Sequence, residues 1–360
     1  MKILDKYIIS KFLGTFFYAI ALIISIAIIF DFSEKVDDFL QREAPARAII
    51  FDYYFNFIPY FVNLFSPLFT FIAVVFFTSK MASDTEIVAI LASGVSFKRM
   101  LRPYLVAASV LAILSFLLIN FIIPPANKTR LEFEEQYIRN PYFNREYNIH
   151  RQIGPGNFIY FESYNNQRNI GYKFSIEHID KESGEMKYKL MADVITWDTI
   201  INKWKLENYF HRTIDGLNEN VVTGHTLDTL FNFYPDEFGK RINNIETMNY
   251  FELNEFIEQE KFKGSDYVVY YEIEKYQRMA LPFATFILTI IGVSIASRKV
   301  RGGIGLHIGL GLLISFTYIL FLQISTTFAT NAGLAPVIAV WIPNILYMFL
   351  GIYLLKQAPK

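Results

Sequence analysis

Six long apolar runs, separated by polar stretches, dominate the pattern of this chain. Each run is free of Asp, Glu, Lys and Arg and is long enough for a helix to cross the hydrocarbon core of a bilayer. The first run follows Lys2, Lys6 and Lys11, as in a signal peptide, but it is too long for one and lacks a small-residue cleavage site, so we expect an uncleaved anchor. The predicted membrane-spanning helices cover residues 12–30, 53–78, 104–123, 279–297, 304–328 and 334–355.

Basic residues gather in the connections on one side of these spans. The amino-terminal stretch, the loops after the second and fourth spans and the carboxyl-terminal tail all fall on that side, whereas the opposite loop, residues 31–52, is rich in acids. Short connections rich in Lys and Arg stay in the cytoplasm. We therefore expect both termini to be cytoplasmic and the region between the third and fourth spans to lie outside.

That region changes to short alternating strands with turn residues between them. Pro124-Pro125 is expected to end the third span, residues 127–139 are expected to form a short helix, and strands follow from about residue 148. Strands at this spacing predict a sandwich or an open barrel. We therefore predict three spans in residues 1–123, an external β domain in residues 124–266 and three further spans in residues 267–360.

One polar segment, residues 79–99, separates the second and third spans. Ser83 and Glu86 have the spacing of a capping box, and Gly94 suits a left-handed position after a helix, so a short helix is predicted over residues 84–93. Its apolar face would carry Ile87, Ile90 and Leu91. Its other face would carry Glu86, Ala89 and Ser93, which are small or acidic and leave room for a close neighbour.

Composition supports a membrane protein and removes several kinds of chemistry. The chain is 53% hydrophobic with zero formal net charge and no cysteine. It lacks a phosphate-binding loop motif, so any ATP must be hydrolysed by another subunit, and it lacks the common hydrolase and zinc-protease motifs. We interpret His307, the one ionisable residue within a predicted span, as an interfacial residue. The other histidines are scattered, so we expect no catalytic residue, no metal site and no cofactor.

Several segments resemble the LptF/LptG (YjgP/YjgQ) family of permeases, and the resemblance covers nearly the whole chain. Residues 84–96 resemble the family's coupling segment. Both have a glutamate, followed by alternating small and aliphatic residues and then a small-x-Gly-x-Ser pattern. Further similar segments are residues 4–8, more like the LptG half, and 124–127, 248–253 and 281–283.

The resemblance implies a helical bundle of six transmembrane helices with a periplasmic β-jellyroll-like domain inserted between helices 3 and 4. The implied function is the inner-membrane permease subunit of an ABC exporter that extracts lipopolysaccharide and passes it to a periplasmic bridge. The implied partners are an LptB-like ATPase dimer, a second LptF/LptG-type subunit, an LptC-like protein and an LptA-like bridge. Whether this chain is the LptF-like or LptG-like half, or a homodimer, stays open, as do the helices of any lateral gate.

Two groups of site residues follow from the resemblance. The coupling helix would fit a groove of the ATPase, with Glu86 as its best contact; the alternative, a plain helix cap, is compatible with that contact. Lipid A would need an apolar cavity with a basic rim. The predicted coupling residues are Glu86, Ala89, Ala92, Ser93 and Gly94. The predicted substrate-binding residues are Lys35, Arg42, Arg47, Phe30, Phe65, Phe69 and Phe316.

Two other functions are weighed against this one. A mechanotransmission subunit of the MacB or FtsX type also pairs with an ATPase and an external domain, but such proteins typically have four spans. A membrane-anchored enzyme that modifies glycolipids would need a cluster of catalytic acids or histidines at the membrane surface, and the sequence shows none.

Overall fold

The computed structural model describes the whole chain except residues 1, 141–142, 240–241, 299–302 and 359–360. The described residues form two compact units, and each is described by itself. We call them the membrane unit, which comprises residues up to 139, 246–253 and from 269 onward, and the β unit, which comprises residues 140–245 and 254–268.

Six helices of the membrane unit are long and apolar enough to cross a bilayer, which confirms the predicted number. In chain order the helical elements are α1 (Ile3–Gln41), α2 (Ala46–Ala48), the π-helical turn η1 (Ile49–Tyr54), α3 (Phe55–Ser83), α4 (Glu86–Ala92), α5 (Phe97–Leu117), the π-helical turn η2 (Leu118–Ile122), α6 (Ile123–Tyr137), α9 (Val268–Ala296), α10 (Gly303–Ala332) and α11 (Pro336–Gln357).

Two boundaries differ from those expected. The region 31–52, expected as a loop, is mostly helical: the 39 residues of α1 reach about 58 Å, well beyond an apolar core of about 30 Å. Pro124-Pro125 does not end the third span, because α5, η2 and α6 follow one another without a break. Proline is tolerated in the first turn of a helix, and both prolines stand there in α6. The short helix expected over 127–139 is confirmed as part of α6.

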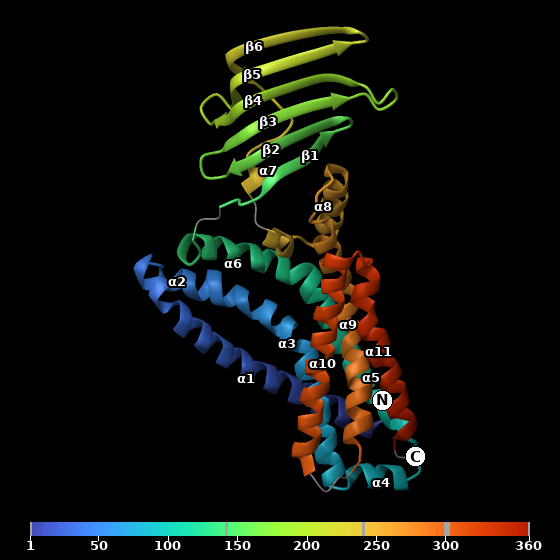
Figure 1. Ribbon diagram of the computed structural model, residues 1–360. Helices are drawn as coiled ribbons and strands as arrows, with labels where there is room; N and C mark the ends of the chain where they lie inside the picture. Colours follow the sequence, from blue (N-terminus) through green and yellow to red (C-terminus); the bar gives the residue numbers. More distant parts are fainter. Residues whose placement is uncertain (1, 141–142, 240–241, 299–302, 359–360) are drawn as a thin grey trace. The chain divides into compact units, whose positions relative to one another are not determined.

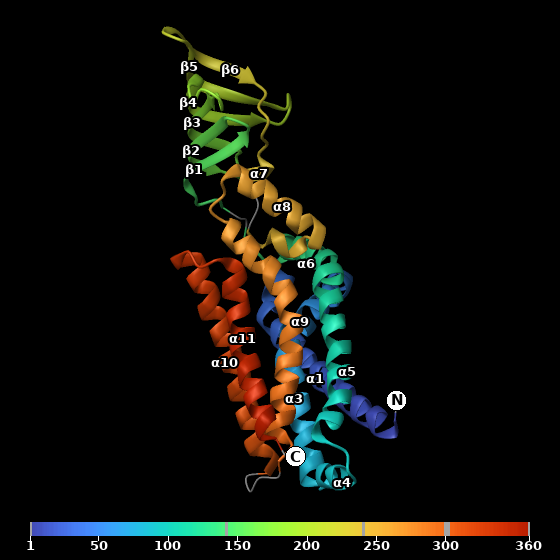
Figure 2. The same cartoon turned by 90° about the vertical axis from the view of Figure 1, so that its right-hand side faces the viewer.

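A narrow apolar stripe holds α1 to its neighbours. Its buried side chains recur every fourth residue, a spacing that keeps them on one face of a helix. They are Ile8, Phe12, Phe16, Ile20 and Ile24. α1 lies against α3 and α5, and α3 lies on its other side against α10 (Figures 1 and 2). α3 is therefore the helix that joins the two groups of spans.

The β unit contains one antiparallel sheet in which every strand pairs with the next in sequence (Figure 1). The strands are β1 (Tyr147–Gly154), β2 (Asn157–Asn165), β3 (Ile170–Ile179), β4 (Met186–Asp198), β5 (Lys203–Asp215) and β6 (Asn218–Thr229). The expected β domain is confirmed. Short turns join strands in sequence order, so the described strands form a meander, whereas a jellyroll would place non-consecutive strands side by side.

One face of the sheet is covered by an aromatic cluster. Phe161 is fully buried, and its ring lies 5.2 Å from that of Phe174 and 5.1 Å from that of Phe238. Trp204, also fully buried, donates its indole N–H to the carbonyl of Phe233 at 3.0 Å. The segment after β6, which continues through α7 (Asp236–Gly239), the 3-10 turn η3 (Ile242–Thr247) and α8 (Tyr250–Lys263), therefore supplies rings that seal the sheet.

We expect Phe161→Ala to destabilise the β unit by about 3–5 kcal/mol, because it removes a fully buried ring and leaves a cavity. The measurement is thermal unfolding of the detergent-solubilised full chain, followed by tryptophan fluorescence with Trp341 of α11 replaced by Phe in every variant, so that the signal comes from Trp197 and Trp204. Val222→Ala, an exposed position on β6, is the control and should unfold like the wild type. Equal unfolding temperatures for the two variants would contradict the assigned core.

Candidate functional site

The candidate coupling helix α4 follows α3 after a turn of two residues. Thr85, the residue before α4, has a left-handed backbone with φ of +62°, and the Asp84 N–H donates to the carbonyl of Lys80 at 2.9 Å. The capping box was a wrong prediction: Ser83 is the last residue of α3, and no side chain caps α4. Gly94 does have the expected left-handed backbone, with φ of +87°.

The two faces of α4 differ as the sequence predicted. Ile87 is buried, and Ile90 and Leu91 pack against the same apolar cluster, which also contains Ile8 and Phe12 of α1. The small residues Ala89, Ala92, Ser93 and Gly94 are all exposed. A short helix thus stands on an apolar support and offers a surface of small side chains that another backbone can approach closely. The role of this surface stays a prediction.

Glu86 makes a contact that the sequence did not suggest. The Tyr7 hydroxyl, on the second turn of α1, donates to both carboxylate oxygens of Glu86 at 3.1 and 3.3 Å. Close by, Arg99 of α5 binds both carboxylate oxygens of Asp5 at 2.7 and 2.8 Å. No short-range pattern could reveal these contacts, because their partners lie 79 and 94 residues apart.

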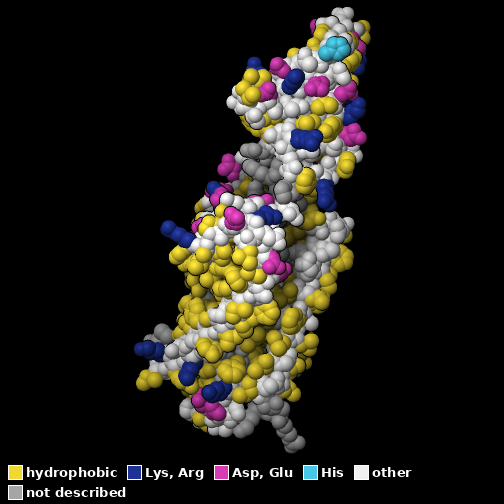
Figure 3. Space-filling model, turned by 90° about the vertical axis from the view of Figure 1, so that its left-hand side faces the viewer, with side chains coloured by type: hydrophobic (Ala, Val, Ile, Leu, Met, Phe, Trp, Pro, Cys, Tyr) yellow, Lys and Arg dark blue, Asp and Glu magenta, His cyan; other side chains and the backbone are white. Residues whose placement is uncertain are grey.

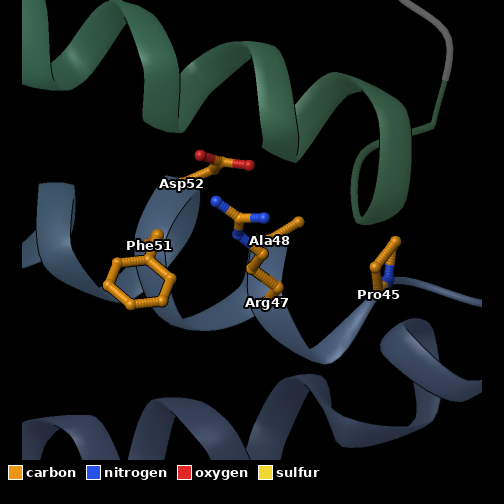
Figure 4. A pocket seen from close by; sticks show the side chains of 5 residues that line it. All are labelled: Pro45, Arg47, Ala48, Phe51 and Asp52. Carbon is orange, nitrogen blue, oxygen red and sulfur yellow. The ribbon is translucent and has the colours of Figure 1, made fainter.

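The three candidate basic residues lie at the other end of the membrane unit from α4, and two of them are bound within the chain (Figure 1). Lys35 pairs with Asp31 at 2.5 Å and also donates to the Tyr53 hydroxyl. Arg42 donates to the carbonyl of Arg139 at 2.8 Å. Arg47 is exposed and lines a shallow hollow of about 410 Å³ (Figure 4). The hollow is lined by Pro45, Arg47, Ala48, Phe51 and Asp52.

The candidate phenylalanines do not meet in one place. Phe30 of α1 and Phe316 of α10 are exposed, at 72% and 60% of their surface. Phe65 and Phe69 are half-buried on α3, where they pack against the apolar cluster beneath α4 and α1. Figure 3 shows a broad apolar face on the membrane unit, with charged side chains toward its ends. That surface suits contact with acyl chains, whether of the bilayer or of a substrate.

A cluster of buried charges at the α6 end was missed by the sequence analysis. Arg130 is 7% exposed, lies 4.7 Å from the centre of the Tyr60 ring and faces Glu134 and Glu246 at 3.8 and 3.9 Å. Burial and the neighbouring Glu274 carboxylate raise the pKa of Glu246, an effect that Arg130 partly offsets. The i,i+4 spacing of Arg130 and Glu134 was the one visible signal.

His307, which stands near the start of α10, is buried within the protein, a burial that the sequence did not predict. It is 4% exposed on α10, and its Nδ1 lies 2.7 Å from the Ser79 hydroxyl of α3. Among the residues that the structure describes, no group of three or more His, Cys, Asp or Glu side chains is placed to hold a metal ion.

The fold and these segments define a multi-pass membrane protein with an inserted β domain and a short exposed helix between spans. The model of the lipopolysaccharide export system permease family LptF/LptG matches residues 6–357. The chain therefore belongs to the LptF/LptG family of lipopolysaccharide export permeases.

Two curated relatives bear the name lipopolysaccharide export system permease protein LptG, one from Escherichia coli strain K12 and one from Escherichia coli O6:H1 strain CFT073. Each is 18% identical to this chain over 364 residues, covering 99% of this chain and 98% of the relative. Full-length coverage supports the family, while this low identity gives only weak support to the LptG half over the LptF half.

We expect Arg130→Met to destabilise the membrane unit by about 3 kcal/mol, because Glu246 would lose its paired cation and Glu134 would keep only Arg139, which binds it at 2.6 Å. Thermal unfolding of the purified full chain measures the effect. Lys128→Met makes the same chemical change at an exposed position of the same helix and should leave stability unchanged. Indistinguishable unfolding of the two variants would show that the Arg130 cluster contributes no stability.

Proposed function

We propose that this chain is the membrane subunit of an ATP-driven exporter that extracts lipopolysaccharide from the bacterial inner membrane and passes it to a periplasmic bridge. The single observation that carries the proposal is α4, whose small residues are exposed while Ile87 anchors the helix to the core. An exposed short helix with a firm apolar support can receive force from a partner and pass it to the spans. We expect no cofactor in this chain.

The proposed partners are an LptB-like ATPase dimer at α4, a second LptF/LptG-type permease subunit, an LptC-like protein and an LptA-like bridge. In this arrangement both termini and α4 face the cytoplasm and the β unit is periplasmic, as the distribution of Lys and Arg favours. The end strands β1 and β6 each have one strand neighbour in the sheet. Either edge could therefore pair with a strand of a periplasmic partner.

The basic residues at the α1–η1 end are proposed to face the anionic head of the lipid. Arg47 is the most accessible of the three, whereas Lys35 and Arg42 would have to exchange internal partners for phosphate oxygens. Phe30 and Phe316 are proposed to contact acyl chains because they are exposed on spans. Phe65 and Phe69 are proposed to shape the wall behind them.

We expect Ala89→Trp to weaken binding of the ATPase by about tenfold or more, because an indole on the exposed face would hold the two surfaces apart. The permease is co-purified with its organism's LptB-like ATPase, and ATP hydrolysis is measured with and without lipopolysaccharide. Ala46→Trp, an exposed alanine at the opposite end of the membrane unit, is the control and should bind normally.

The outcomes separate the candidate functions. A wild-type complex whose hydrolysis responds to lipopolysaccharide, and which Ala89→Trp disrupts, supports the exporter. A stable complex that never responds to the lipid favours mechanotransmission. Failure of the wild-type chain to bind the ATPase would overturn the proposal.

We expect Arg47→Ala to raise the lipopolysaccharide concentration that gives a half-maximal response of ATP hydrolysis by about fivefold. This is the loss of affinity expected for one exposed charge-assisted contact to phosphate. Hydrolysis in the absence of lipid should not change. Lys205→Ala, on an exposed position of β5, serves as the charge-matched control. An unchanged lipid response in the Arg47 variant would remove this residue from the proposed rim.

A further inference from the structure

Two polar contacts join the start of α1 to the segment that carries α4. We call them the α1 clamp: Asp5 with Arg99, and Tyr7 with Glu86. Asp5 and Tyr7 both lie in the first two turns of α1, and their partners flank α4, since Glu86 is the first residue of that helix and Arg99 lies in the first turn of α5. The clamp therefore brackets residues 86–99, the part of the polar segment that contains α4.

The Asp5–Arg99 pair has the geometry of a rigid connection. Two parallel N–H to oxygen contacts of 2.7 and 2.8 Å fix the direction of both side chains. The backbone also orients each partner: the Lys2 N–H donates to Asp5 at 3.0 Å, and the Arg99 N–H donates to the Ser96 hydroxyl, which caps α5. Asp5 and Arg99 are 12% and 29% exposed, so the pair is partly shielded from water and salt.

The Tyr7–Glu86 contact reaches α4 itself. Glu86 has its two oxygens occupied by the Tyr7 hydroxyl at 3.1 and 3.3 Å, on the side of α4 that adjoins α1. Ile8, next to Tyr7, and Ile87, next to Glu86, belong to one buried apolar cluster. Polar and apolar contacts thus hold the start of α1 against the start of α4.

We infer that Glu86 is a positioning residue that binds the first spanning helix to the coupling helix, so that α1 follows α4 when the ATPase moves it. This inference rests on the proposed function and differs from an ATPase contact made by Glu86 itself. The exposure of α1 agrees with it: within this chain only 22% of its most apolar window is buried, as for α10, against 67% for α9. A helix held by one narrow stripe can shift as a unit when its end is displaced.

The first test observes the clamp in the isolated full chain. Because the sequence has no cysteine, Ile3→Cys provides a unique site for a spin label, at a side chain that is 93% exposed near the start of α1. Tyr7→Phe deletes one hydroxyl and keeps the ring, and it should increase the mobility of the label. Tyr353→Phe makes the same deletion at an exposed position of α11 and should not. Equal spectra for the two variants would overturn the Tyr7–Glu86 contact.

The second test measures transmission in the complex with the ATPase. Tyr7→Phe should reduce the lipopolysaccharide released per ATP hydrolysed about threefold, the size expected for one partly exposed hydrogen bond to a charged group, while ATPase binding stays at the wild-type level. Asp5→Arg and Arg99→Asp should each lower this ratio, and the double variant, which exchanges the two charges, should restore it. A role in folding alone would change the amount of complex and leave the ratio unaltered.

The outcomes distinguish the clamp from the proposed function. A wild-type complex that exports lipid, together with Tyr7→Phe and Asp5→Arg variants that export at the wild-type ratio, overturns the clamp and leaves the function intact. A loss of ATPase binding in Tyr7→Phe would also overturn it, because Glu86 would then serve docking. If the wild-type chain exports no lipid, the proposed function fails, and the spin-label spectra alone decide whether the clamp exists.

Discussion

The packing of α3 between α1 and α10 is the constraint on which the membrane unit depends. In an apolar bilayer there is little hydrophobic drive between helices, so close packing and interhelical hydrogen bonds must hold them together. α3 supplies both. Gly292 of α9 comes so close to Val74 of α3 that a Cβ there would lie 2.9 Å from the valine side chain. Any larger residue at position 292 would force the Val74 and Phe71 side chains, or the helices themselves, to shift.

Buried polar side chains of α3 form hydrogen bonds with two other helices, α5 and α10. Asn63 accepts from the Ser115 hydroxyl at 2.7 Å, at the junction with α5, and Thr78 donates to Tyr104 at 3.1 Å. Ser79 meets His307 of α10 at 2.7 Å. The Ser79 contact stands only a few residues before the turn into α4. A displacement of α4 therefore acts on a helix that is bonded to α10 on one side, while the α1 clamp receives it on the other.

The sequence predicted those features that depend on local pattern. The spans follow from apolar runs, because a bilayer demands helices whatever the tertiary contacts are. The two faces of α4 follow from helical periodicity alone. The capping box at Ser83 and Glu86 failed because the pattern does not say where the preceding helix ends, and burial of the α3 residues Met81 and Ala82 favours its continuation to Ser83. Likewise, Pro124-Pro125 fits a helix start as well as a helix end.

The predicted basic rim shows why charges are harder to assign than spans. Lys35 has an acid at i−4, Asp31, so its internal pair was within reach of sequence reasoning, but its second partner, Tyr53, comes from another helix. A cation that already holds a carboxylate and a hydroxyl binds phosphate only by giving up those contacts, which lowers the net gain in free energy. Arg47 is exposed, so it would give up fewer internal contacts than Lys35 on binding phosphate. Accessibility, which depends on the fold, therefore ranks Arg47 above Lys35 as the proposed first contact for an anionic lipid head.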